Sequence, residues 1–208
     1  EFNKEKTEAL EGIKSQEKSV SAASSRVSNY LVYGKNHPYG EFVSKESIEN
    51  VTLADVEQYY QDYFVPENAY LIVIGDVKFK EVKKIISKNF SKWRKATAPS
   101  FSIPTVKNVQ YTQVNFVDMP DAVQSEISII NTIDFKMNDA DYHAALIANK
   151  IYGGGFNSML NLNLREANGW TYGARSSIRA NKYTQASFTS STSVRNSVTD
   201  SAVVETLK

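Results

Sequence analysis

The spacing of apolar residues along the chain predicts six helices. The helix predicted within residues 4–30 has sparse apolar positions and is expected to be largely exposed, whereas the helix within 78–93 has a continuous apolar stripe. Thr52, with Asp55 three residues on, is close to a capping box at the start of the second. Asn138, with Asp141 three residues on, is the expected cap of the fourth. The predicted helices lie within residues 4–30, 51–66, 78–93, 138–155, 156–168 and 197–208.

Short runs rich in β-branched and aromatic residues predict five strands. The first is almost uninterruptedly apolar and is expected to be buried, and the last two are joined by a turn near Asn181. The predicted strands lie within residues 68–77, 109–119, 125–133, 170–183 and 184–194. Short turns between neighbouring strands favour antiparallel pairing, so we predict an α+β fold with two-layer units of antiparallel or mixed sheet packed with helices.

One stretch interrupts this order and predicts a domain boundary. Residues 95–107 contain two prolines and have no periodicity, which is typical of a linker. We therefore expect one folded unit in residues 1–95 and another in 108–208, each exposing an apolar face when isolated. Both ends of the chain have helical sequence, so we expect a segment of a longer polypeptide.

The composition limits the partners and the kinds of site that the chain can have. The net charge is +1, from 24 basic and 23 acidic residues, which gives no electrostatic case for nucleic acid as a partner. No apolar run is long enough for a membrane span. Cysteine is absent, which fits the cell envelope, including a bacterial periplasm, and the cytosol equally. Only His37 and His143 could supply imidazole, so histidine-based metal chemistry within this chain is not expected.

Three stretches together resemble the pitrilysin/insulinase family of zinc metallopeptidases, in a form similar to mitochondrial processing peptidase. They are HPYGE, then VTLADVEQYYQDYFVPENAYLIVIGDV, then IYGGGFNSMLNLNLREANGWTYGARSS. The resemblance implies that residues 1–95 are the rear part of one metallopeptidase-like domain. Residues 108–208 would be the front part of a second domain, which carries an arginine and a tyrosine that reach the substrate chamber.

By this resemblance the arginine and tyrosine are Arg165 and Tyr172. A fixed guanidinium and a phenol can stabilise the negative charge that develops on a peptide carbonyl oxygen during hydrolysis, without either group having to ionise. From the two-residue period of a strand, we expect Trp170, Tyr172 and Ala174 to share one face. Sequence pattern alone favours a structural interpretation, with Arg165 a solvated helix arginine and Tyr172 a half-buried strand tyrosine, and the family resemblance reverses this preference.

The metal site of the catalytic half is missing from this sequence. No HxxEH motif occurs, so no residue of this chain by itself is expected to be catalytic or to bind metal. Gly12 occupies the position that the resemblance assigns to the third, glutamate zinc ligand, and Glu11 becomes the candidate if the alignment is shifted by one residue. Close packing against a neighbour is the structural alternative for Gly12.

The resemblance leads to one functional hypothesis and one alternative. The chain is expected to be the non-catalytic, substrate-binding half of a zinc peptidase. It would need no cofactor of its own, and would bind peptide together with an HxxEH-bearing half or subunit that holds the zinc. The alternative is a proteolytically inactive scaffold subunit of the same fold, which would require neither Arg165 nor Tyr172.

Overall fold

The computed structural model describes residues 1–208 and confirms an α+β chain, divided into two compact units. The first unit comprises residues 1–9 and 44–102, and the second comprises residues 10–43 and 103–208. The later boundary follows Ser102, whereas residues 10–43, which were expected to fold with the rest of 1–95, belong to the second unit. None of the helices is both long and apolar enough to cross a bilayer.

The first unit is helical. The expected first helix is two helices, α1 (Phe2–Gln16) and α2 (Val20–Tyr33), because Ser19 caps the second by accepting a hydrogen bond from the Ala22 N–H. The start of α1 lies in the first unit, with α3 (Lys45–Asn50), α4 (Leu53–Tyr63), the 3₁₀ turn η1 (Pro66–Asn68) and α5 (Phe79–Phe90). The capping box of Thr52 and Asp55 is confirmed at the start of α4.

The second unit contains the only sheet. Its three strands are β1 (Gln124–Ile133), β2 (Ala174–Arg179) and β3 (Ala186–Arg195), in the antiparallel order β1-β3-β2. Besides the end of α1 and all of α2, its helical elements are α6 (Tyr142–Tyr152), α7 (Met159–Asn161), η2 (Leu162–Ala167), the 3₁₀ turn η3 (Asn196–Val198) and α8 (Thr199–Thr206). Asp141, not Asn138, precedes the first turn of α6.

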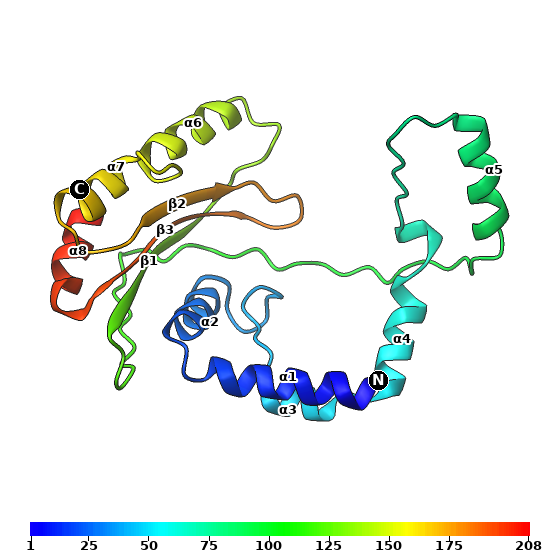
Figure 1. Ribbon diagram of the computed structural model, residues 1–208, viewed down its shortest axis with the longest axis horizontal. Coiled ribbons are helices and arrows are strands. Elements are labelled where there is room, and N and C mark those ends of the chain that lie inside the picture. The colour runs from blue at the N-terminus through cyan, green and yellow to red at the C-terminus, as the bar shows by residue number, and fades with distance from the viewer. The chain divides into compact units, whose positions relative to one another are not determined.

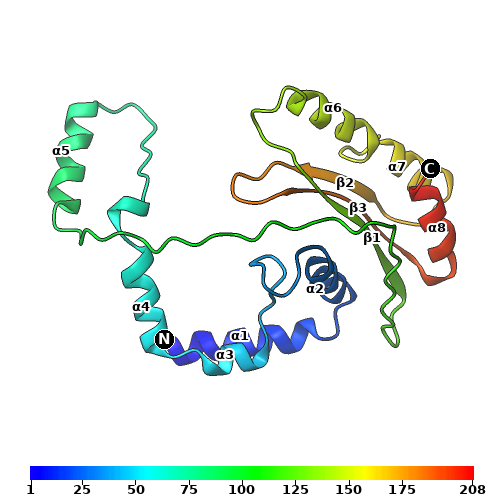
Figure 2. The ribbon, with the colours of Figure 1, turned by 180° about the vertical axis from the view of Figure 1, so that it is seen from behind.

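A small core joins these helices to one face of the sheet. Its buried residues are Ile127, Leu160, Leu164, Ala174, Val194 and Ala202. Figure 1 shows α6 and α7 running along this face, and Figure 2 shows α2 on the opposite side of the sheet, where it packs near β1. Tyr152 on α6 packs against this core, and its hydroxyl links α6 to α8 by donating a hydrogen bond to the Thr206 carbonyl, 3.1 Å away.

Two of the expected strands are not formed. Residues 68–77 and 109–119 make no strand pairs, and most of their apolar side chains are exposed, so the expectation of a buried strand at 68–77 is wrong for this chain. A strand requires a neighbour for its backbone hydrogen bonds, and this chain supplies none at either place. Exposed large apolar side chains occur in both units of the structure.

The turn after α2 encloses a buried histidine. His37 is 1% exposed; its Nδ1 accepts a hydrogen bond from the Tyr39 N–H at 3.0 Å, and its Nε2 lies 3.2 Å from the Thr184 hydroxyl. Its ring stacks on Tyr33 with centroids 4.8 Å apart. Because Nδ1 is an acceptor, the ring is neutral and Nε2 carries the proton that is donated to Thr184.

This geometry predicts acid sensitivity of the second unit. Burial lowers the pKa of His37 below its ordinary value of 6.5. As the pH falls through 6.5, His37 binds a proton in the unfolded chain but remains neutral in the folded chain. The free energy of unfolding therefore falls as the pH drops below 6.5. The melting temperature should fall more between pH 7.5 and pH 5.5 in the wild type than in His37→Asn, which keeps an acceptor near Tyr39 but does not titrate. Equal pH dependence in the two proteins would contradict this prediction.

Candidate functional site

The candidate site lies where η2 returns to the sheet at β2. η2 is a π-helical segment, with a wide turn closed by the Asn168 N–H donating to the Asn163 carbonyl. Gly169 follows with a left-handed φ of 62°, and the N–H groups of Gly169 and Trp170 bond back to the carbonyls of Arg165 and Leu164. Single π turns within helices recur at functional sites. The hydrogen bonds of this turn hold the backbone at Arg165 in place.

Core packing fixes the position of η2. Leu164 has no exposed surface and contacts the apolar cluster over the sheet. The side-chain oxygen of Asn161 accepts a hydrogen bond from the Ala174 N–H at 2.8 Å, which ties α7 to the first residue of β2. Arg165 and Tyr172 thus lie on either side of a connection that is anchored at both ends.

Arg165 is held against an aromatic ring. Its guanidinium carbon lies 4.4 Å from the centre of the Phe156 ring, in a cation–π contact. Its buried Nη1 forms an ion pair with Glu166 Oε1 at 3.2 Å but makes no hydrogen bond within the chain. A buried donor without an acceptor is costly, and its presence in a native protein requires an explanation.

Tyr172 is almost fully exposed to solvent. Its side chain is 93% exposed, and its hydroxyl makes no hydrogen bond within the chain, including with Arg165. The expectation that Trp170, Tyr172 and Ala174 share one face is wrong: Ala174 is buried and Trp170 packs on the core, whereas Tyr172 points to solvent. β2 begins only at Ala174, and the Thr171 hydroxyl bonds both the N–H and the carbonyl of Gly173, which turns the chain before the strand starts.

Sequence reasoning missed Phe156 as the partner of Arg165. Phe156 follows the three glycines, in the loop between α6 and α7. The first of these glycines allows a close approach: a Cβ at Gly153 would lie 2.5 Å from Ser176 N, whose N–H donates to the Gly153 carbonyl. Gly153 ends α6, as expected of a C-cap. No periodicity connects this loop to η2, so the sequence carries no signal for the Phe156–Arg165 contact.

The structure does not assemble a metal site. No three His, Asp or Glu side chains lie close enough together to hold an ion. His37 uses both ring nitrogens in hydrogen bonds, and His143 lies exposed on α6. Glu11 and Gly12 are exposed on α1. The residues present therefore do not fit a zinc ion.

Gly12 is not needed for close packing. A Cβ built at this position meets no atom of this chain within 4 Å, so no neighbour within the chain requires a glycine there. Gly12→Ala should therefore stabilise α1 by up to about 1 kcal/mol, because glycine is the poorer helix former. A small rise in the thermal or chemical unfolding midpoint is the expected measurement, whereas a loss of stability would show a contact that the open space excludes.

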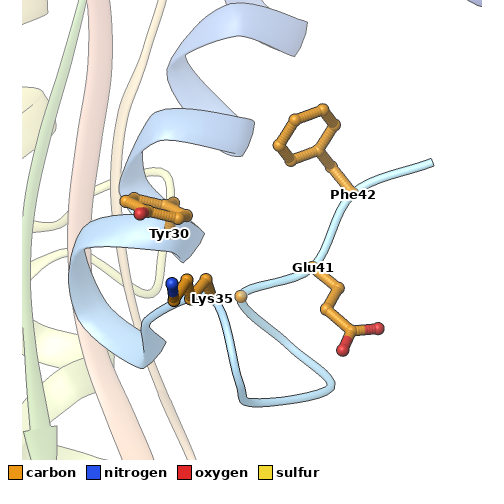
Figure 3. A pocket seen from close by; sticks show the side chains of 5 residues that line it. Tyr30, Lys35, Glu41 and Phe42 are labelled. Carbon is orange, nitrogen blue, oxygen red and sulfur yellow. The ribbon is translucent and has the colours of Figure 1, made fainter. Parts of the chain in front are cut away.

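A separate hollow lies at the end of α2. Its volume is about 260 Å³, and it is lined by Tyr30, Lys35, Gly40, Glu41 and Phe42. Figure 3 shows the Glu41 carboxylate directed away from Lys35, so the hollow presents no paired or convergent polar groups. It contains neither Arg165 nor Tyr172 and is not part of the candidate site.

Comparison with known proteins agrees with the fold and with the missing metal site. The family described as "Peptidase M16 inactive domain" matches residues 50–208. The chain is 28% identical over 150 residues to the "probable inactive metalloprotease YmfF" of Bacillus subtilis (strain 168), a match that covers 71% of this chain and 35% of that protein.

Solved structures share the fold at low sequence identity. The peptidase M16 inactive domain from Pseudomonas fluorescens superposes with a TM-score of 0.83 at 21% identity, over 99% of this chain and 49% of that one. A protease from Helicobacter pylori superposes with a TM-score of 0.76 at 17% identity, over 98% of this chain and 50% of that one. The chain thus spans about half the length of these solved relatives.

Proposed function

The chain belongs to the family of peptidase M16 inactive domains, and on this premise we propose that it is the substrate-binding, non-catalytic half of a zinc peptidase. It would work with an HxxEH-bearing half or subunit, on the same polypeptide or another, that holds the zinc and cleaves the peptide. Residues 1–95 and 108–208 would contribute to two consecutive domains of this half, joined through 95–107. The family, together with the lack of a metal site, supports the non-catalytic part of this proposal.

The buried Nη1 of Arg165 carries the substrate-binding part of the proposal. This donor makes no hydrogen bond within the chain, although Glu166 Oε1 forms an ion pair with it at 3.2 Å, and stacking on Phe156 limits the directions from which a further acceptor can approach. A peptide carbonyl oxygen is an acceptor of the right kind and would be bound by a charge-assisted hydrogen bond.

Tyr172 supplies the second donor. Its exposed hydroxyl can donate to the same carbonyl oxygen. As negative charge develops on the carbonyl oxygen during hydrolysis, both donors stabilise it without moving a proton. Positioning the peptide and stabilising this charge are the roles we assign to the two residues.

Site-specific crosslinking tests the substrate-binding role. In the assembled peptidase, a photoreactive benzoylphenylalanine in place of Tyr172 should capture a bound peptide. The same group in place of Tyr183, another exposed tyrosine in the turn between β2 and β3, should not. Equal capture at both positions, or none at Tyr172, would favour the alternative of an inactive scaffold.

A further inference from the structure

The face of the sheet that is turned away from the core is hydrophilic and basic. Along β2, alternation buries Ala174 and Ser176 on the core side and leaves Arg175 and Arg179 exposed on the opposite side. Before its last residue, Arg195, the neighbouring strand β3 contributes only half-buried hydroxyl side chains to this opposite face. They belong to Ser187, Thr189, Ser191 and Ser193.

The chain does not neutralise the positive charge of this face. Neither Arg175 nor Arg179 forms an ion pair. β2 and β3 contain no acidic residue, and neither does α2, which packs near β1 on this side of the sheet (Figure 2). Glu126 of β1 is the one acid of the sheet, and it accepts a hydrogen bond from Ser193 at 2.6 Å. The two arginines are therefore available to a negatively charged partner.

The side chains of this face suit carboxylates at a defined spacing. An arginine can hold a carboxylate by two parallel hydrogen bonds, which a lysine cannot do, and the neighbouring hydroxyls can donate further bonds. Arg175 and Arg179 are four residues apart on one strand, which separates their backbones by about 13 Å. Two acidic side chains four residues apart in an extended peptide have the same separation and the same direction.

This face begins beside the candidate site. Arg175 follows Tyr172 by three residues, so their backbones are at most about 11 Å apart. A peptide that reaches the Tyr172 hydroxyl can therefore extend over the face. We propose that Arg175 and Arg179 are specificity-determining residues that select peptides with acidic side chains four residues apart. This inference deepens the proposed function and rests on it.

A purely structural role for the two arginines makes a different prediction. β2 lies at an edge of the sheet, in the order β1-β3-β2, and charged residues on edge strands prevent pairing with another molecule. That role is filled by charge of either sign and has no influence on which peptide is bound. Reversing the two charges therefore separates selection of acidic peptides from protection of the edge.

Peptide capture by the assembled peptidase, with benzoylphenylalanine in place of Tyr172, tests the proposal. One substrate peptide is made with Glu, Gln or Lys at two positions four residues apart, and the pair is moved along the peptide one residue at a time. At one placement, half-maximal capture of the Glu peptide should need about tenfold less peptide than capture of the Gln peptide. Arg175→Glu with Arg179→Glu should instead favour the Lys peptide.

Two further variants complete the comparison. Arg175→Gln with Arg179→Gln should capture the Glu and Gln peptides equally, and it serves if the charge-reversed protein does not fold. Lys14→Glu, at an exposed lysine of α1 without an ion pair, should keep the wild-type order, because it changes the net charge at a distance from β2 in the sequence.

The outcomes distinguish this inference from the proposed function. Equal capture of the three peptides by the wild type at every placement would overturn the selection of acidic peptides and leave peptide binding at Tyr172 standing. Loss of the preference in Lys14→Glu would also overturn it, by showing an effect of net charge alone. Capture of none of the peptides would overturn the proposed function and this inference with it.

Discussion

Gly153→Ala is expected to destabilise the second unit by about 3 kcal/mol, from overpacking combined with the loss of a hydrogen bond. The new Cβ would lie 2.5 Å from both the backbone nitrogen and the hydroxyl oxygen of Ser176, and 2.7 Å from Leu160 Cδ1. A flexible side chain could move aside, but the backbone of β2 cannot move without breaking the 3.0 Å hydrogen bond from Ser176 N–H to the Gly153 carbonyl. The attachment of α6 to β2, which also involves Asn149 and Ser176, would loosen.

Chemical denaturation followed by circular dichroism measures this effect. Gly12→Ala is the matched control, because it is the same substitution at a glycine with open space around it, and its effect should have the opposite sign. A Gly153→Ala protein as stable as the wild type would show that the end of α6 is not pressed against the sheet.

Arg165→Ala and Tyr172→Phe should each lower peptide turnover by the assembled peptidase well over tenfold. A preorganised donor aimed at developing negative charge contributes about 3 kcal/mol to transition-state stabilisation. Tyr172→Phe removes one exposed hydroxyl that has no partner within the chain, so folding should be unaffected. Arg165→Ala removes a guanidinium that already lacks one hydrogen bond, so its cost to stability should be small compared with its cost to turnover.

The elements with a strong local signal were predictable from the sequence. The Thr52–Asp55 capping box, the three strands of the sheet and the amphipathic α5 all appear close to their expected positions. Each depends on periodicity or capping within a few residues, which a single sequence contains in full. The segment at 68–77 has an equally strong strand pattern, but pairing requires a neighbour that this chain does not supply.

The candidate site was only partly predictable. The family resemblance singled out Arg165 and Tyr172, but the two-residue period placed Tyr172 on the same face as Trp170 and Ala174, which lie against or within the core. The turn at Thr171 overrides that period by satisfying the backbone of Gly173 locally. The π turn of η2 and the Phe156–Arg165 contact depend on tertiary packing between segments with no shared periodicity, and no pattern in the sequence could predict them.

The central claim is that Arg165 and Tyr172 act on one substrate group, and a double-mutant cycle tests it most directly. Turnover of one peptide by the assembled peptidase is measured for Arg165→Ala, Tyr172→Phe and the double variant, with thermal melts of each as the folding control. If the claim is correct, both single variants melt like the wild type and lose turnover more than about tenfold, and the double variant loses much less than the product of the two. Near-wild-type turnover in both single variants would contradict the claim and leave the pair as surface residues of an inactive scaffold.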